Sequence, residues 1–210
     1  TPMSVVMALA GRLTEVTWMM LAHDMGVISE NAVNTVLKDL NKMKSLLIGP
    51  GLSTEKTTGE FLKQILAISS EKKKPAKRQL GFGIQSDPNT DNNEDEKVSL
   101  PPLVIDADGL NLLAEMDTWW ELLPKDTILT PHPGEMGRLC GISTKEVQAN
   151  RWQLARDKAQ AWDVTLVLKG AYTLIASAEG QFAVIPFAVD ALATAGTGDI
   201  LAGLIVGLRA

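Results

Sequence analysis

Val164-Thr-Leu-Val-Leu168, followed at once by Lys169-Gly170, is a short apolar run with the length of a buried strand. Similar runs at residues 45–48, 103–105 and 127–129 also end at a polar or Gly/Pro cluster. Longer amphipathic stretches separate them, and this alternation is typical of a parallel sheet with helices on both faces. The sequence therefore predicts an α/β fold whose polar clusters meet at the carboxyl edge of the strands, where such folds bind ligands.

The residues after Lys169 follow a different pattern. Two short apolar segments, 172–175 and 182–185, flank Glu179-Gly180, which is typical of a β-hairpin rather than of another helical crossover. We therefore expect a mixed but mostly parallel central sheet that ends in a C-terminal β-hairpin.

Two of the amphipathic stretches carry clear helix signals. Residues 30–40 have apolar side chains at helical spacing, and Ser143-Thr-Lys-Glu146 is a capping box that opens a helix through Trp162. The second helix should face the core with four side chains, those of Val147, Leu154, Ala155 and Trp162.

Composition and charge exclude several classes of protein. The 210 residues include 20 Lys plus Arg and 25 Asp plus Glu, so the net charge of -5 offers no field for nucleic acid or an anionic membrane. A single cysteine, Cys140, excludes an internal disulfide and a cysteine-cluster zinc site. The longest apolar run, 200–208, is too short to cross a membrane, and a signal peptide is not apparent. We expect a cytoplasmic protein with no nucleic-acid or membrane partner.

The domain organisation has two further features. The chain begins at Thr1 without an initiator Met and stops at Ala210 inside an apolar helical pattern, so we expect residues 1–210 to be one domain, truncated at both ends. Residues 71–100 turn first basic and then acidic, with scattered Asn, Ser and Pro, and cannot contribute much core. They are predicted to be an inserted, solvated loop, with a docking or lid segment as the alternative.

The segment Ala193-Thr-Ala-Gly196-Thr-Gly198-Asp199 precedes an apolar helical run. Its small residues let the backbone curl, so the amides around Gly196 to Asp199 should point out of a helix N-terminus, which is a site for phosphate oxygens. Asp199 could cap this helix or act as a base that takes a proton from a hydroxyl group. A glycine-rich capped helix without a ligand is the competing interpretation.

Two other loops follow predicted strands. Lys169-Gly170 can place an ammonium and a bare backbone beside a phosphate or a nucleotide ring, although a lysine at a strand end is usually only solvated. Pro131-His132-Pro133 holds a histidine in a rigid loop, ready to donate to a ligand oxygen. Glu135 is better explained as an acidic residue in an ordinary first helical turn.

Asp106-Ala-Asp108-Gly109-Leu-Asn111 places two carboxylates and an amide after the strand at residues 103–105. Such a group suits a Mg²⁺ held largely by water or a polar ligand, and it equally suits a helix capped by Asp108. Gly49-Pro-Gly51-Leu-Ser53 is a strand-to-helix turn whose glycines permit close backbone approach, but it is not a Walker A loop.

Taken in order, the clusters resemble those of the ADP- or ATP-dependent NAD(P)H-hydrate dehydratases, which belong to the ribokinase-like superfamily. The similarity runs from about Leu46 to Gly203 apart from the charged insertion. It is carried by Gly-Pro-Gly-Leu, Asp-Ala-Asp-Gly-Leu-Asn, Thr-Pro-His-Pro-Gly-Glu, Leu-Lys-Gly-X-X-Thr and Ala-Gly-Thr-Gly-Asp-X-Leu-Ala-Gly.

The resemblance implies a ribokinase-like fold and a repair reaction on hydrated NADH or NADPH. The ring hydroxyl would be phosphorylated by ADP or ATP with Mg²⁺, and loss of phosphate would restore NAD(P)H, with Asp199 as the catalytic residue. The hydrated nucleotide would contact Gly51, Asp108, Asn111, His132 and Asp199. The adenine nucleotide would contact Lys169, Gly170, Ala171, Tyr172, Thr173, Gly196, Thr197 and Gly198, while the metal ligands stay unassigned.

The resemblance further implies a homo-oligomer and, in the longer protein, a fused epimerase domain. Two alternatives remain at this stage. A ribokinase-like small-molecule kinase would share Asp199 and the glycine-rich turn but would keep its phosphorylated product. A nucleotide-binding domain without turnover would have no need of the Asp199 carboxylate.

Overall fold

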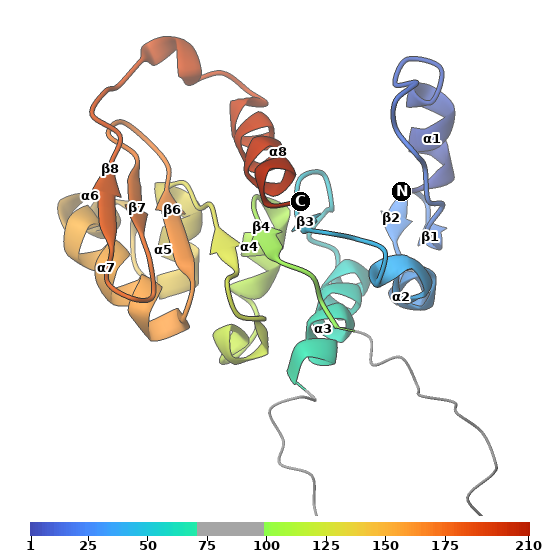
Figure 1. Ribbon diagram of the computed structural model, residues 1–210, viewed down its shortest axis with the longest axis horizontal. Coiled ribbons are helices and arrows are strands. Elements are labelled where there is room, and N and C mark those ends of the chain that lie inside the picture. The colour runs from blue at the N-terminus through green and yellow to red at the C-terminus, as the bar shows by residue number, and fades with distance from the viewer. Residues whose placement is uncertain (71–98) are drawn as a thin grey trace, which may run out of the picture.

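The computed structural model describes residues 1–70 and 99–210 (Figure 1). The inserted loop predicted at 71–100 thus lies almost wholly outside the described residues. A six-stranded sheet with the strand order β3-β4-β5-β6-β7-β8 forms the centre. Its first four strands are parallel and its last two antiparallel, which confirms the mostly parallel sheet with a C-terminal hairpin. The strands are β3 (Leu46–Ile48), β4 (Leu103–Ile105), β5 (Ile128–Leu129), β6 (Thr165–Leu168), β7 (Leu174–Ala176) and β8 (Phe182–Val184).

The parallel strands end in register. Ile48 pairs with Ile105, and Ile105 pairs with Leu129. Backbone bonds continue the alignment just beyond the strands, from Lys169 N to the carbonyl of Pro131 at 2.8 Å and from Asp106 N to the carbonyl of Ile48 at 3.1 Å. The polar clusters after these strands therefore share one edge of the sheet, as the sequence predicts.

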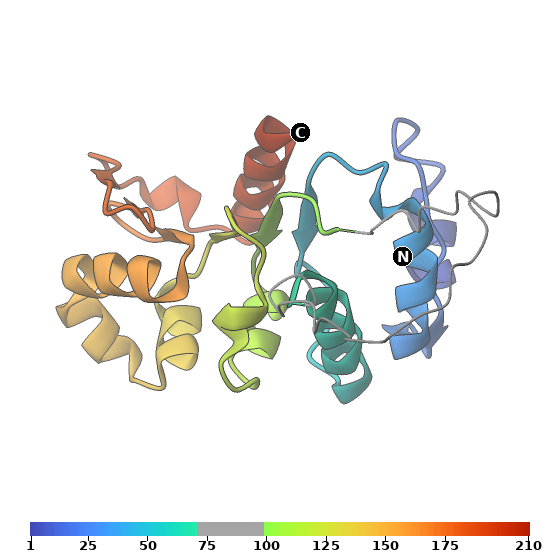
Figure 2. The same cartoon turned by 60° about the horizontal axis from the view of Figure 1, so that its bottom comes forward.

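Alternate residues of each strand build two different cores, because successive side chains of a strand point to opposite faces. One face packs on α3 (Lys56–Ser70), α4 (Asp108–Leu113), α5 (Pro133–Cys140) and α7 (Arg151–Trp162). On the other face, Val104, Ile128 and Val167 pack with Ile205 and Val206 of α8 (Thr197–Arg209). Figure 2 shows α8 across the sheet from α3, α4, α5 and α7, which confirms helices on both faces.

The helix predicted over 143–162 is in fact two helices, α6 (Thr144–Ala149) and α7. Asn150 interrupts them with φ -126° and ψ 24°, and its side-chain amide donates to the carbonyl of Glu146. Asparagine competes with the helical backbone in this way, which explains the break. The capping box at Ser143 is confirmed, and so is the burial of the predicted core residues: Val147, Ala155 and Trp162 are buried, and Leu154 packs partly buried against them.

The helix predicted over 30–40 is present as a 3-10 turn, η1 (Glu30–Ala32), that leads into α2 (Val33–Leu40). The N-terminal part also holds α1 (Met3–Leu9) and a two-stranded sheet of β1 (His23–Asp24) and β2 (Val27–Ile28). Further 3-10 turns are η3 (Trp119–Leu122) and η4 (Asp190–Leu192). Across residues 1–70 and 99–210, no helix is long and apolar enough to cross a membrane.

Candidate functional site

The N-terminus of α8 is open. Gly196 precedes the helix in a left-handed conformation with φ 86°, and no side chain caps the first turn. The Thr197 hydroxyl instead closes the preceding turn by donating to the carbonyl of Thr194 at 2.8 Å and to that of Leu192 at 2.9 Å. Because the first amides of a helix have no intrahelical acceptor, those of Gly198 and Asp199 are available to an anion.

Asp199 is the third residue of α8 and is exposed. The interpretation of Asp199 as the helix cap is wrong, since Gly196 holds the cap position and no side chain accepts from the first turn. The carboxylate has no hydrogen-bond or ion-pair partner within the described ranges. It is therefore accessible to a hydroxyl group of a ligand, and its role as a base stays a prediction.

Lys169, at the end of β6, points into the carboxyl edge of the sheet. Its Nζ lies 2.6 Å from Asp106 Oδ1 and 3.8 Å from Glu135 Oε2. The ammonium also lies next to α8, because a Cβ built on Gly198 would sit 3.4 Å from Nζ. The lysine thus joins the ends of β4, β5 and β6 to the first turn of α8, and it is not the merely solvated strand end of the alternative interpretation.

Asp106 and Asp108 have different partners in the structure. Asp106 is 1% exposed, and its Oδ2 has no hydrogen-bond partner among the described residues. Asp108 Oδ2 accepts from the amide of Ser53 at 2.9 Å, and the helix cap is Ala107 rather than Asp108. The described residues include no group of three His, Cys, Asp or Glu side chains that could hold a metal ion.

The sharp turn between the two carboxylates depends on a strained residue and a close approach. Ala107 has φ 49° and ψ -122°, a conformation that a residue with a Cβ rarely adopts. Gly49 lies against it so closely that a Cβ there would come within 1.7 Å of the carbonyl oxygen of Asp106. The close approach therefore requires glycine at Gly49. Gly51, the predicted substrate residue, lies exposed with open space around it, and only its φ of 67° favours glycine there.

His132 caps α5 with its ring. Nδ1 accepts from the amides of Gly134 at 3.0 Å and Glu135 at 3.3 Å, so a neutral ring carries its hydrogen on Nε2. The side chain is 51% exposed, and Nε2 lies 3.4 Å from Glu135 Oε1. The His132 ring can therefore donate to a ligand oxygen from Nε2. Glu135 completes the capping box by accepting from the His132 amide at 2.7 Å, which confirms its predicted place in the first turn.

The remaining predicted residues lie around this edge. Asn111 Oδ1 accepts from Arg138 at 3.0 Å, which fixes the amide of Asn111 and leaves its nitrogen as a donor. In the loop 169–173, Gly170 has φ 131°, Tyr172 has φ 54° and is exposed, and the Thr173 hydroxyl donates to the carbonyl of Gly170 at 2.9 Å.

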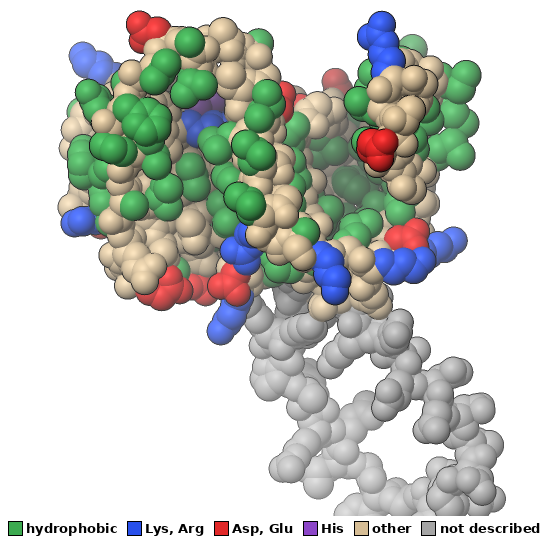
Figure 3. All heavy atoms as spheres, turned by 45° about the horizontal axis from the view of Figure 1, so that its top comes forward, with side chains coloured by type: hydrophobic (Ala, Val, Ile, Leu, Met, Phe, Trp, Pro, Cys, Tyr) green, Lys and Arg blue, Asp and Glu red, His purple; other side chains and the backbone are tan. Residues whose placement is uncertain are grey.

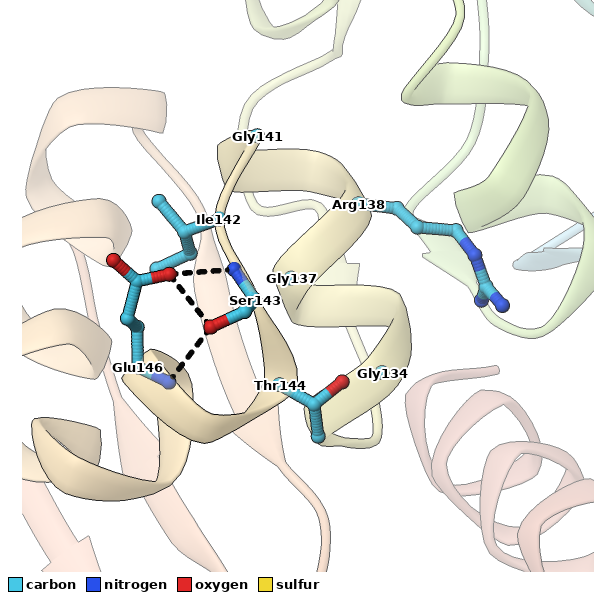
Figure 4. Close-up of a pocket in the computed structure, with 8 residues that line it drawn as sticks. All are labelled: Gly134, Gly137, Arg138, Gly141, Ile142, Ser143, Thr144 and Glu146. Atoms are coloured by element: carbon cyan, nitrogen blue, oxygen red, sulfur yellow. Dashed lines mark hydrogen bonds between the residues drawn. The ribbon is translucent and has the colours of Figure 1, made fainter.

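Figure 3 shows basic and histidine side chains at the bottom of a hollow between α8 and the strands of the hairpin. A different hollow, of about 510 Å³, lies along α5 and the start of α6. Figure 4 shows its lining, in which Glu146 turns back onto Ser143 while Arg138 points away. None of the predicted site residues lines this second hollow, so we place the candidate site at the carboxyl edge of the sheet.

The sequence did not indicate two partners of the lysine loop. Asp106 was considered only with Asp108, although it is the nearest partner of Lys169. Arg151 was not considered, although its guanidinium donates to the carbonyls of Leu168, Lys169 and Ala171. Partial burial lowers the pKa of Arg151 below its usual value, but an arginine stays charged at neutral pH. No local pattern could have paired Arg151 or Asp106 with a loop so far along the chain.

The architecture is that of a ribokinase-like protein. A ribokinase-like superfamily protein from Enterococcus faecalis matches with a TM-score of 0.62 and 24% identity, over 95% of this chain and 56% of its own. The sequence model of the NAD(P)H-hydrate dehydratase family matches residues 77–210, more than half of the chain. The chain belongs to this family.

Two relatives show how much of a family member the chain represents. The bifunctional NAD(P)H-hydrate repair enzyme of Moorella thermoacetica is 36% identical over 99% of this chain, which spans 34% of that protein. The ADP/ATP-dependent NAD(P)H-hydrate dehydratase of Bacillus subtilis, co-crystallised with ATP and Mg²⁺, has a TM-score of 0.66 and 25% identity over 98% of this chain and 58% of its own. The chain therefore spans about a third of the curated relative and under two thirds of the solved one.

Proposed function

We propose that the chain carries the active site of a nucleotide-dependent NAD(P)H-hydrate dehydratase, which returns hydrated NADH or NADPH to NAD(P)H. The observation that carries this proposal is the exposed, unpartnered Asp199 carboxylate in the first turn of α8, beside the Gly198 amide and the Lys169 ammonium. Membership of the family supports it, and so do the names of the relatives from Moorella and Bacillus.

The reaction converts the ring hydroxyl, a poor leaving group, into a phosphate ester, whose phosphate is a good leaving group. Asp199 accepts the proton of the ring hydroxyl while that oxygen attacks the terminal phosphoryl group of ADP or ATP, whose terminal phosphoanhydride bond breaks to release AMP or ADP. The Gly198 amide and the Lys169 ammonium stabilise the charge on the moving phosphoryl group. The ring nitrogen then supplies the electron pair that expels phosphate from the ring, and loss of a proton from the neighbouring ring carbon restores the reduced nicotinamide. No covalent intermediate with the protein is required.

The two ligands would meet at Asp199. The adenine nucleotide is placed on the loop 169–173 and on Gly196, Thr197 and Gly198. We place the hydrated nucleotide on Gly51, Asp108, Asn111 and His132. The donors there are the Asn111 amide nitrogen and His132 Nε2, which lies 3.4 Å from Glu135 Oε1 and is half exposed. Asp108 Oδ2 is already engaged by Ser53, so Asp108 would reach the ligand through its other oxygen.

Mg²⁺ is proposed to arrive with the nucleotide. The described residues form no carboxylate cage for it, and Asp106 is already paired with Lys169. The ion would be held by phosphate oxygens and water, and we route no step through it. We also propose that the protein is a homo-oligomer in the cytoplasm. We further propose that the chain is part of a longer protein with a fused epimerase domain, which the bifunctional relative supports.

The test is the appearance of the near-ultraviolet absorbance of reduced nicotinamide after hydrated NADH, Mg²⁺ and ADP or ATP are mixed with the protein. We expect a nucleotide-dependent rise with release of free phosphate, and a loss of about 10²- to 10⁴-fold in kcat for Asp199→Asn, because a general base contributes that much. The assay is run on this chain and on a version extended at both ends.

Two results would overturn the proposal. Phosphorylated hydrate that accumulates without release of phosphate would make the protein a kinase. If neither version forms reduced nicotinamide although both still bind the nucleotide, the protein would be a nucleotide-binding domain without turnover.

A further inference from the structure

Arg151, the first residue of α7, reaches across to the loop that follows β6. Its Nη1 donates to the carbonyl of Ala171 at 2.7 Å, and its Nη2 lies 3.3 Å from the carbonyl of Lys169 and 3.4 Å from that of Leu168. The side chain is half-buried between the helix and the loop. One planar guanidinium thus holds carbonyls from three of four successive residues.

The fourth carbonyl, that of Gly170, is held by the hydroxyl of Thr173 at 2.9 Å. Gly170 lies close to the arginine, so that a side chain at this position would be crowded: a Cβ on it would come within 3.2 Å of Arg151 Nη2. Its φ of 131° is a conformation that favours glycine. Arg151, Gly170 and Thr173 together therefore fix every carbonyl from Leu168 to Ala171.

Fixing the carbonyls also fixes the amides. In a planar trans peptide the N–H points opposite to the carbonyl of the residue before it. Because the Lys169 and Gly170 carbonyls are turned toward Arg151 and Thr173, the N–H groups of Gly170 and Ala171 point away from those side chains. Neither N–H has an acceptor within residues 1–70 and 99–210, so both remain available to a ligand.

We infer that Arg151 is a positioning residue for adenine-nucleotide binding. It orients the peptides that join Lys169, Gly170 and Ala171 so that the free amides of Gly170 and Ala171 face an acceptor group of the nucleotide, and it does so without touching the nucleotide. This inference rests on the proposed function, because the loop 169–173 is where that function places ADP or ATP. An arginine suits the task better than a lysine, since an ammonium cannot span carbonyls that lie along a loop.

The test compares Arg151→Gln with Arg156→Gln. Arg156 is an arginine of the same helix that lies over the Phe182 ring, 4.5 Å from its centroid, and serves as the matched control. Arg151→Gln should raise the KM for ADP or ATP by about 10- to 100-fold, because it removes hydrogen bonds from a charged donor. The KM for the hydrated substrate and kcat at saturating nucleotide should change less than about threefold. Arg151→Lys should recover only part of the loss, and Arg156→Gln should match the wild type.

The outcomes separate the inference from the proposed function. An equal rise in both KM values, or a loss only in the folded fraction measured by thermal unfolding, would mean that Arg151 is merely structural. If the wild type shows no dehydratase activity, titration calorimetry with ADP still decides: weaker binding by Arg151→Gln alone supports positioning. Equal binding by all variants, or no binding by the wild type, overturns it.

Discussion

Two loops face the candidate site, and they are built in opposite ways. In the loop 169–173, the carbonyls are held by Arg151 and Thr173, and the Lys169 ammonium is held by Asp106. At the start of α8, no side chain caps the helix and Asp199 stands exposed. A loop that already has its bound conformation loses less conformational entropy when a ligand binds, so binding costs less free energy. The lysine loop is thus held in place by the protein's own side chains, whereas the first turn of α8 keeps its polar groups open. Under the proposed function, the nucleotide would meet a loop that is already formed, and the reacting atoms would meet the open turn.

The largest expected effect on stability comes from removing the Lys169 ammonium, which pairs with carboxylates at the edge of the sheet. Lys169→Met leaves two carboxylates, those of Asp106 and Glu135, buried without their cation. We expect the free energy of unfolding to fall by about 3–5 kcal/mol, as for other buried pairs that lose one partner. Urea-induced unfolding measures it. Asp199→Asn, in the open turn, should cost less than about 1 kcal/mol, since it removes only a favourable interaction with the helix dipole.

Two further variants serve as controls for this prediction. Adding Asp106→Asn to Lys169→Met removes one uncompensated charge and should recover most of the loss. Lys42→Met, which removes the lysine of the exposed Lys42–Asp39 pair, should leave unfolding unchanged. A Lys169→Met protein as stable as the wild type would show that the loop is not held by this pair.

A smaller effect is expected when alanine replaces the glycine of each loop. Gly170→Ala meets both an unfavourable φ of 131° and the guanidinium of Arg151, so it should cost about 2–3 kcal/mol and weaken ADP binding. Gly196→Ala has an unfavourable φ of 86° but no heavy atom within 4 Å of the added Cβ, so about 1 kcal/mol is expected. Chemical unfolding and ADP titration measure the pair, and equal costs would contradict the difference between the loops.

The smallest expected effect comes from the hydroxyl that holds Gly170. Thr173→Val removes one hydrogen bond and should cost about 1 kcal/mol. Because Arg151 still holds the neighbouring carbonyls, the KM for ADP should rise less than about threefold. Thr173→Ser keeps the hydroxyl and is the control. An effect on KM as large as that of Arg151→Gln would mean that the threonine, and not the arginine, orients the loop.

Local sequence patterns predicted the strands well, because each strand is a short apolar run that stops at a polar cluster. They also predicted the capping box at Ser143, whose partners are close in the chain. They could not predict the break at Asn150, where a side chain outcompetes the helical backbone over a single residue. That α8 is the one helix packed on its face of the sheet, within residues 1–70 and 99–210, was also not predicted.

The site was predicted only in outline. The alternation of strands and helices predicted that the polar clusters share one edge, since parallel strands all end on the same side of the sheet, and the structure confirms this arrangement. The contacts that shape the site link distant positions, such as Lys169 with Asp106 and Ser53 with Asp108. A single amino-acid sequence holds no signal for such distant pairs. It also does not indicate His132 as a helix cap, because histidine is not a preferred capping residue.

The far end of α8 holds the helix on the sheet and so sets the position of Asp199 at its other end. The helix that carries Asp199 is anchored near its far end, where Ile205 and Val206 pack on the sheet and the Val206 carbonyl accepts from the Ser45 hydroxyl at 2.8 Å. At 1.5 Å per residue, that anchor lies about 10 Å from the carboxylate. A change in side-chain volume at Val206 would tilt the helix and displace Asp199. If the proposed function holds, selection for catalysis would also act on apolar residues at the far end of α8, and directed evolution of the activity should include them.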